Sequence, residues 1–437
     1  MKFIPQTSRD QIMLLPPSIN DFIEDGHIVR TIDEIVERLD TKGIEDKYSE
    51  LGRPAFHPKM LLKVLLYGYS SGLRASRKIE DACKSNLYYM YLSGMQTPDF
   101  WTICLFRRKF ADEVEGLFCQ VVRICVEMGI TRLGRISLDG SKLRASASAK
   151  RTKTKEEIED LMKKVREEIT TALLEAESID EEENHLYGER RGDELPKEIR
   201  NKEARLKRLD EALKRLEGEE KEKVNLTDTD ARFMQERHGV IKPAYNCQVA
   251  ATPEQVIVAY DTVSEATDIK QLKPMVEKVE ENTKNPVEEL KADCGYASQS
   301  NYEYAAGTKE IDIYMPDKGF VKERKRCMKE GLPFPCEALI SKGSNTNKTP
   351  DMIAREKLYI PENYRKYKAR MYEIEPIFGH LKFNLGYRHF LLRSQKKVKG
   401  EFGLMCAAYN LMKIWKAKTG KDRKIRSWNG LNMAWSV

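Results

Sequence analysis

The sequence predicts an α/β domain built on a mixed β-sheet, preceded by a helical segment. The first observation is the order of apolar segments after residue 131, where strand patterns alternate with helical ones. The second is an early strand pair joined by a short turn, because a hairpin followed by helix–strand units is typical of a mixed sheet covered by helices. The third is the length of 437 residues, which suits about three structural units.

Residues 1–130 predict a helical N-terminal domain. One apolar stripe follows Pro58, a residue suited to the first turn of a helix, and a second stripe ends at Gly129. The stripes comprise Met60, Leu61, Val64, Leu65 and Tyr69, and then Leu117, Val121, Ile124 and Met128. The pattern is compatible both with a helix-turn-helix-like DNA contact and with a helical scaffold or dimerisation unit.

The strand patterns lie on both sides of a long helical insertion. We expect strands at residues 135–139, 244–250, 255–260, 289–293 and 311–315. Thr252-Pro253-Glu254 fits a turn between the second and third strands. Apolar residues at helical spacing predict helices at 268–282 and 298–306.

Residues 152–223 predict an inserted antiparallel hairpin of two long helices. Leucine, isoleucine and valine repeat at intervals of three and four, and Leu195-Pro196 separates the two repeats. The repeats are Ile158, Leu161, Val165, Ile169 and Leu173, and then Leu206, Leu209, Leu213 and Leu216. This segment has 17 basic and 23 acidic residues, which makes it a poor ligand for DNA. We therefore interpret it as a structural arm or an oligomer contact.

Composition excludes several classes of protein. Hydrophobic residues make up 41% of the chain, and 14 Phe, 19 Tyr and 4 Trp are too many aromatics for a disordered chain. No apolar run reaches the roughly 18 to 20 residues that cross a bilayer, and the N-terminus lacks a signal-peptide pattern. Nine scattered cysteines without a CxxC pair favour reduced thiols. The sequence contains no glycine-rich phosphate loop, so no nucleotide cofactor is expected.

The formal net charge of +7 is unevenly distributed along the chain. Residues 364–437 hold 17 basic against 4 acidic residues, so this segment alone carries +13. Such a basic stretch is a candidate for contact with a phosphate backbone, although a lone basic run is more often a solvated helix face.

Three carboxylates lie at positions suited to binding divalent cations. Asp139 and Asp293 each end an expected strand, and Glu375 lies in an expected helix. Carboxylates from separate elements can hold two Mg²⁺ ions, which prefer oxygen ligands. Each acid alone is more often a cap, a turn former or a surface charge.

Five motifs give the chain a strong resemblance to the DDE-type transposases of bacterial insertion sequences, in a branch with a helical N-terminal domain and a helical insertion. The resemblance covers about residues 5–418. The motifs are Ser137-Leu138-Asp139-Gly140-Ser141-Lys142, Asp228-Thr229-Asp230-Ala231-Arg232-Phe233, Pro243-Ala244-Tyr245-Asn246-Cys247-Gln248, Lys291-Ala292-Asp293-Cys294-Gly295-Tyr296 and Ile374-Glu375-Pro376-Ile377-Phe378-Gly379.

The resemblance implies a ribonuclease H-like fold whose metal-binding catalytic triad is Asp139, Asp293 and Glu375. It implies two divalent ions, Mg²⁺ or Mn²⁺. It also divides the chain into a DNA-end-binding domain at 1–130, a catalytic domain at 131–151 and 224–437 with a basic tail, and the hairpin at 152–223.

The family's Tyr-Arg-Glu-Lys signature is approximated by Tyr367, Arg370, Glu375 and Lys382, although Arg370 is one residue further from the glutamate than usual. Glu373 is a competing acid, and Glu375 is preferred because Pro-Ile-Phe-Gly follows it. Lys382 fits either a phosphate contact or a solvated helix lysine. The expected DNA-binding residues are Arg370, Lys382, Lys396, Lys397 and Lys399, with Lys421, Arg423, Lys424 and Arg426 further along the tail.

Asp228 and Asp230 are expected to have mainly a structural role, in which they cap or hold the exit of the helical insertion. A role in catalysis is the second expectation for them.

Residues 316–362 depart from the family pattern, because Cys327 and Cys336 replace a cysteine-bearing strip and have no nearby histidine to complete a zinc site.

The implied activity is metal-dependent strand cleavage and strand transfer at the ends of an insertion sequence. The implied partners are double-stranded DNA with terminal inverted repeats, target DNA, and further copies of the chain in a dimer or larger synaptic complex. No membrane partner is expected, and the expected location is the cytoplasm, at the bacterial nucleoid. The alternatives are a hydrolytic nuclease on the same fold and an inactive or domesticated copy that only binds DNA.

Overall fold

The computed structural model describes residues 18–49, 54–187, 197–218, 223–235, 239–335, 339–340 and 348–421, and the side chains of 173–187 and 197–200 are not described. These residues form two compact units. One unit contains the described residues up to Ile130 together with those from Leu404 onward. The other runs from Thr131 to Gly403.

The first unit is helical, as the apolar stripes predict. Pro58 occupies the first turn of α3, and α7 ends beside Gly129, whose φ of +64° lies in the left-handed region. Its helices before residue 130 are α1 (Ile28–Arg38), α2 (Lys42–Glu45), α3 (Pro58–Ser71), α4 (Ser76–Ser85), α5 (Leu87–Ser93), α6 (Phe100–Lys109) and α7 (Val114–Glu127), after a 3₁₀ turn at Ile19–Phe22. The fully buried Tyr69 and Phe118 lie in its core.

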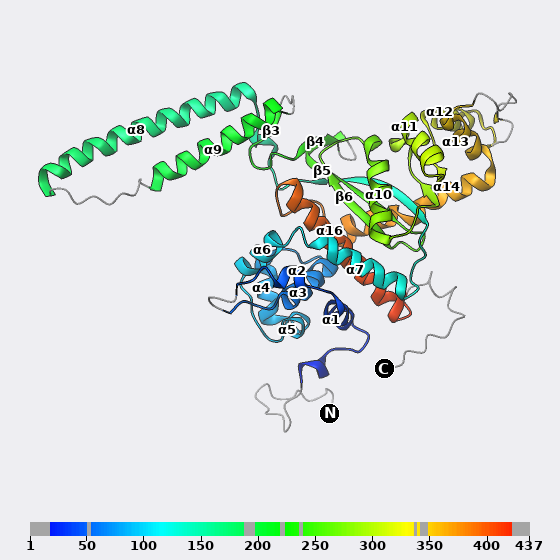
Figure 1. Cartoon of the computed structure of the whole chain (residues 1–437), viewed down its shortest axis with the longest axis horizontal. Helices are drawn as coiled ribbons and strands as arrows, with labels where there is room; N and C mark the ends of the chain where they lie inside the picture. The colour runs from blue at the N-terminus through cyan, green and yellow to red at the C-terminus, as the bar shows by residue number, and fades with distance from the viewer. Residues whose placement is uncertain are drawn as a thin grey trace, which may run out of the picture. The chain divides into compact units, whose positions relative to one another are not determined.

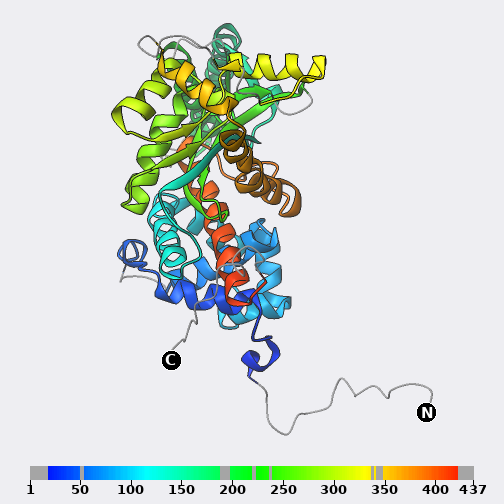
Figure 2. The same ribbon diagram turned by 90° about the vertical axis from the view of Figure 1, so that its right-hand side faces the viewer.

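The second unit contains a six-stranded mixed sheet, seen from two directions in Figure 1 and Figure 2. Its strands are β1 (Arg135–Arg144), β4 (Arg232–Gln235), β5 (Ile241–Ala251), β6 (Ile257–Val263), β7 (Glu289–Lys291) and β8 (Asp312–Tyr314). The order is β4-β5-β1-β7-β8, and β6 also pairs with β5. β1 is antiparallel to β5 and parallel to β7, so the predicted mixed sheet is confirmed.

Helices connect and cover these strands. α10 (Leu272–Thr283) packs on β5 and β6, and α11 (Gln299–Glu303) continues into a π-helical turn at Tyr304–Thr308 before β8. The turn between β5 and β6 closes with the Gln255 amide donating to the Thr252 carbonyl at 2.8 Å. Apart from β4 and the inserted hairpin with its own short strands, the observed chain order of strands and helices is the one that the resemblance implies.

The first strand is longer than the sequence predicts. Asp139 was expected to end it, but β1 continues to Arg144 because β5 is long enough to pair with it from Ser137↔Ala251 through Arg144↔Ala244. The sequence pattern also missed β4, which pairs with the first part of β5. Asp139 therefore lies within a strand rather than at its end.

The insertion is the predicted antiparallel hairpin. α8 (Lys155–Tyr187) and α9 (Lys197–Gly218) lie side by side (Figure 1), and Lys155 at the start of α8 ion-pairs with Glu217 at the end of α9 at 2.8 Å. The short strands β2 (Thr152–Thr154) and β3 (Lys223–Asn225) pair at its base. Leu195-Pro196 lies outside the described residues. The hairpin's buried side chains are Ile158, Met162, Val165, Leu209, Ala212, Leu216 and Val224.

The chain after β8 is helical. The segment predicted to depart from the family pattern holds α12 (Lys318–Glu330) and α13 (Pro350–Tyr359), and Cys327 is buried while Cys336 lies outside the described residues. α14 (Pro361–Glu373), α15 (Glu375–Gly379), a π-helical turn at His380–Asn384 and α16 (Gln395–Lys418) follow. The division into units falls within α16, whereas the sequence assigns all of 224–437 to one functional domain.

Two further findings bear on composition. None of the described helices is both long enough and apolar enough to span a bilayer. None of the eight cysteines within the described ranges takes part in a disulfide.

Candidate active site

Asp139 lies in β1 just beyond the point where that strand stops pairing with β7. Ser137↔Lys291 is the last pair of the parallel register, while Asp139 remains opposite Val249 of β5. One neighbouring strand therefore holds the backbone of Asp139, and its other side is open to the segment that follows β7. Its side chain is 17% exposed.

Asp293 lies two residues after β7, in extended backbone that begins a 3₁₀ turn at Cys294–Tyr296. Its Oδ1 accepts the Gly295 amide at 2.8 Å, which caps the turn. A carboxylate between a strand and a tight turn has a fixed backbone. The sequence predicts Asp293 as the last residue of its strand, whereas β7 ends two residues earlier, at Lys291.

Glu375 is the first residue of α15, and Ile374 separates that helix from α14. Pro376 occupies the first turn of α15, where a proline needs no hydrogen-bond donor. The side chain of Glu375 is 43% exposed, whereas Glu373 is buried. The competing acid, Glu373, is thus held inside the protein.

Arg370 of α14 connects two of the three carboxylates. Its Nη1 lies 3.5 Å from Oδ2 of Asp139, and its Nη2 lies 3.5 Å from Oε1 of Glu375. Burial lowers the pKa of Arg370. The opposing effect of its neighbours is larger, so the pKa lies above its ordinary value; these neighbours are Asp139, Tyr367, Asp293 and Glu375. The guanidinium therefore stays charged and acts as a counterion for the acids.

The pKa of Asp139 reflects the same crowding of charge. Burial raises the pKa of Asp139 to about 6, Arg370 opposes this rise, and Asp293 and Glu375 add to it. The three predicted acids are therefore close enough to influence one another, and one buried cation compensates them only partly.

The donor chemistry of this group fits a hard divalent cation. Carboxylate oxygens are the ligands that Mg²⁺ prefers, and the raised pKa of Asp139 indicates a place where added positive charge is favourable. No three His, Cys, Asp or Glu side chains in the described part of the chain are set closely enough to hold one metal ion. As placed, Asp139 and Glu375 lie beside the guanidinium of Arg370, and Asp293 influences it electrostatically.

The sequence did not reveal a polar network beside Asp139 that is built around Asp268. Oδ1 of Asp268 accepts hydrogen bonds from Asn246 Nδ2 at 2.6 Å and from Gln248 Nε2 at 2.7 Å, and Lys142 Nζ lies 3.4 Å away. Gln248 in turn accepts a hydrogen bond from the Tyr296 hydroxyl. The signal for this network is two amides at alternating positions of a strand that is buried from Pro243 onward, which places both on one face.

Gly140 makes room for that network. Gln248 is its partner across β1 and β5, and a Cβ on Gly140 would lie 2.5 Å from Gln248 Nε2 and 2.7 Å from Asp268 Oδ1. The glycine next to Asp139 is therefore required by close packing of polar side chains.

The predicted DNA-binding lysines lie in two places. Lys382 Nζ donates to Ser141 Oγ at 2.6 Å and to the Lys142 carbonyl at 2.7 Å, so this lysine is docked on β1 rather than solvated along a helix. Lys396, Lys397 and Lys399 open α16, and Lys399 lies 4.0 Å from Asp261. Arg423, Lys424 and Arg426 lie outside the described residues.

Asp228 and Asp230 have the structural contacts expected of them. Asp228 is buried, accepts the Tyr245 hydroxyl at 2.8 Å and the Ser394 amide at 3.1 Å, and burial raises its pKa. Asp230 ion-pairs with Arg215 of α9 and accepts the Gln395 amide at 2.8 Å. They hold the exit of the hairpin against the start of α16.

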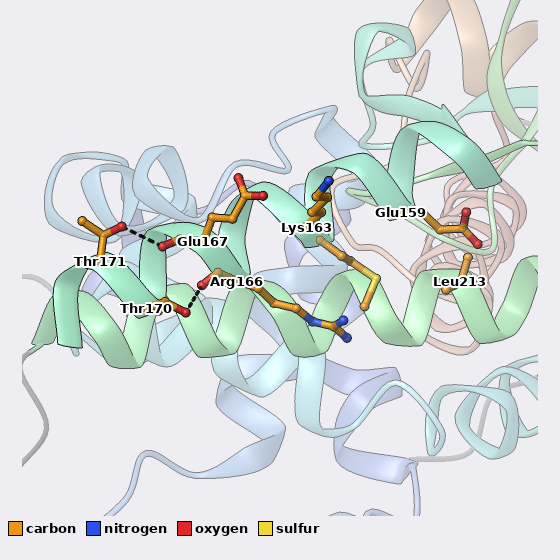
Figure 3. Close-up of a pocket in the computed structure, with 8 residues that line it drawn as sticks. Glu159, Lys163, Arg166, Glu167, Thr170, Thr171 and Leu213 are labelled. Carbon is orange, nitrogen blue, oxygen red and sulfur yellow. Dashed lines mark hydrogen bonds between the residues drawn. The ribbon is translucent and has the colours of Figure 1, made fainter. Parts of the chain in front are cut away.

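A pocket on the hairpin is separate from the carboxylates (Figure 3). The hydroxyls of Thr170 and Thr171 donate to the carbonyls of Arg166 and Glu167, each at 3.0 Å. These hydroxyls are used within α8, and the charged side chains of Glu159, Lys163, Arg166 and Glu167 also line the pocket.

Comparison with known families gives two matches at opposite ends of the chain. Residues 17–109 match a transposase domain (DUF772), and residues 322–415 match a transposase DDE domain. Together the two matches support a DDE-type transposase of the insertion-sequence kind. The second match contains Arg370, Glu375 and Lys382 of the transposase, whereas Asp139 and Asp293 lie outside both matches. Neither a curated protein nor a solved structure matches the chain.

Proposed function

We propose that this transposase cleaves DNA strands at the ends of its insertion sequence and joins them to target DNA, with Asp139, Asp293 and Glu375 as its catalytic acids. The observation that carries the proposal is that Arg370 lies 3.5 Å from both Asp139 and Glu375, while Asp293 and Glu375 raise the pKa of Asp139. They come from β1, from the segment after β7 and from α15, which is the arrangement that the ribonuclease H-like fold of the family implies.

The same three acids would hold two divalent cations, Mg²⁺ or Mn²⁺. When bound, such ions supply an activated water or hydroxyl and stabilise the departing oxygen of the phosphodiester. The chain's own part is to fix the acids on rigid elements. The carboxylates act as ligands rather than nucleophiles, so no covalent bond between protein and DNA is expected.

Positive side chains near the acids would hold the DNA phosphates. Arg370 already lies between Asp139 and Glu375, and Lys382 is fixed to β1 beside Asp139. The lysines at the start of α16 would extend this contact along the backbone. The partners are double-stranded DNA with terminal inverted repeats, target DNA and further copies of the chain.

A plasmid that carries the coding sequence with its native flanking DNA tests the proposal. Purified protein with Mg²⁺ should cut at both flanks and join the released ends to a second plasmid, and Asp139→Asn should do neither. Cutting without joining would favour a hydrolytic nuclease. DNA binding without cutting by the wild-type chain would favour a copy that only binds DNA.

A further inference from the structure

Three buried polar side chains form a cluster next to the elements that carry the candidate acids. Ser137, Lys291 and Glu373 are 0%, 5% and 7% exposed. Ser137 Oγ donates to Glu373 Oε2 at 2.5 Å, and Lys291 Nζ contacts the two carboxylate oxygens of Glu373 at 2.9 and 3.1 Å. Glu289 lies 3.2 Å from the same Lys291 amine. The cluster joins β1, β7 and α14.

Each member of the cluster stands two residues before one of the three acids. Ser137 precedes Asp139, Lys291 precedes Asp293, and Glu373 precedes Glu375. In extended backbone, residues two apart share a face, so Ser137 and Asp139 lie on the same side of β1. α14 contacts both of them, through Glu373 to Ser137 and through Arg370 to Asp139.

The cluster also fixes the register in which the elements meet. Ser137 and Lys291 are direct partners in the parallel pairing of β1 with β7, and Glu373 bonds to both of them. A shift of any one element would break hydrogen bonds to a buried charged group, which is strongly destabilising. Apolar residues could fill the same space, but they would tolerate sliding that charged hydrogen bonds do not.

We propose that Ser137, Lys291 and Glu373 are positioning residues, which hold the three acids at the mutual spacing needed to bind divalent cations. This inference rests on the proposed function, because it concerns the same acids. The three residues do not touch DNA or the reacting atoms in this account. They act through the backbone of the residues two positions further along.

A pair of compensated variants separates positioning from simple stability. Lys291→Met leaves Glu373 without its cation, and Glu373→Gln leaves Lys291 with Glu289 alone, so both should lower the melting temperature. The double variant Lys291→Met/Glu373→Leu removes both charges of the pair, and such replacements are often neutral or stabilising. Glu289 then loses its cation, but its side chain is 16% exposed and reaches water, so the melting temperature should recover toward that of the wild type.

The deciding measurements are Mn²⁺ affinity, followed by electron paramagnetic resonance without DNA, and the cutting rate at saturating DNA. For the double variant we expect Mn²⁺ affinity and cutting rate each at least tenfold below wild type, with unchanged DNA affinity. Ser137→Ala removes only a hydroxyl, and we expect a severalfold lower cutting rate with unchanged DNA affinity. This second variant decides the matter if the double variant fails to fold.

The matched control is Lys278→Met, which removes another largely buried lysine, 2.8 Å from Asp261. It should leave Mn²⁺ affinity and cutting unchanged. Wild-type Mn²⁺ affinity and cutting in a folded double variant, or a wild-type rate in Ser137→Ala where the double variant does not fold, would overturn the positioning role. Failure of the proposed function has a different signature, which is wild-type cutting in Asp139→Asn whatever the cluster variants do.

Discussion

Glu373 and Glu375 are separated by a single residue, yet they lie in different environments, because Glu373 ends α14 and Glu375 begins α15. Glu373 is buried against Lys291 and Ser137, whereas the side chain of Glu375 is 43% exposed beside Arg370. Ile374, between α14 and α15, lets the chain present one acid to the sheet and the next to the site. This difference in environment supports Glu375 as the catalytic acid.

The two glutamates should respond differently to neutralisation. Glu375→Gln should lower the cutting rate by about 100-fold or more, because a lost metal ligand removes several kcal/mol of transition-state stabilisation. Its melting temperature should stay near that of the wild type, since the side chain is partly exposed. Glu373→Gln should lower both the cutting rate and the melting temperature. Parallel thermal melts and plasmid cutting make the comparison, and a destabilised Glu375→Gln with normal cutting would reverse the assignment.

Asp139 should make stability depend on pH in the absence of divalent cations. Burial and the neighbouring acids raise its folded-state pKa to about 6, so the folded chain binds its proton more tightly than the unfolded chain does. Asp139 therefore lowers the free energy of unfolding as pH rises from about 4 to 6, by up to about 3 kcal/mol. Asp139→Asn should be more stable than wild type at pH 7.5, by urea denaturation, and this gain should shrink toward pH 4.5. A constant difference across that range would contradict the prediction.

Gly140→Ala should disturb the site through the Asp268 network. The new methyl group would lie within 2.7 Å of Gln248 Nε2 and Asp268 Oδ1, and both atoms are held by hydrogen bonds to each other. We expect a loss of about 1–3 kcal/mol in the free energy of unfolding, together with slower cutting. Gly116→Ala in α7 is the control, because its methyl group meets nothing within 4 Å and should stabilise the helix by about 1 kcal/mol. Equal effects of the two substitutions would remove the argument for close packing at Gly140.

The lysines at the start of α16 should contribute to DNA affinity through phosphate contacts. Replacing Lys396, Lys397 and Lys399 by alanine should weaken binding and flatten the plot of log affinity against log salt by up to about 3 units, near 0.9 per lost contact. Fluorescence anisotropy over a salt series measures this slope. The control removes three exposed lysines of the acidic hairpin, Lys163, Lys164 and Lys207. An unchanged slope in the α16 variant, or an equal change in the control, would rule out the clamp.

Most of the fold was predictable because its signals are local. Apolar periodicity located α3, α7 and the hairpin, and the alternation of strands and helices predicted the mixed sheet. The predicted end of β1 was wrong because the small, polar run Gly140-Ser141-Lys142 is typical of the end of a strand. Pairing with β5 instead keeps these residues within the strand. Strand length there depends on a partner about 100 residues away, which no local pattern reveals.

The sequence named candidate acids but not their surroundings. Asp139, Asp293 and Glu375 were named from strand ends, motifs and the resemblance, and their role as the site stays a prediction, although Asp293 and Glu375 both raise the pKa of Asp139. The Asp268 network and the Ser137–Lys291–Glu373 cluster depend on contacts between distant elements. A buried lysine beside a glutamate 82 residues later carries no periodic signal.

Metal-directed backbone cleavage tests the central claim most directly, because it locates the ions without DNA or turnover. Fe²⁺ bound in place of Mg²⁺, with ascorbate and peroxide, generates radicals that cut the nearby polypeptide chain. The account predicts fragments ending near residues 139, 293 and 375, competed away by Mg²⁺ and absent in Asp139→Asn. Fragments that map elsewhere, or the same three fragments in Asp139→Asn, would contradict the assignment of these acids as the metal site.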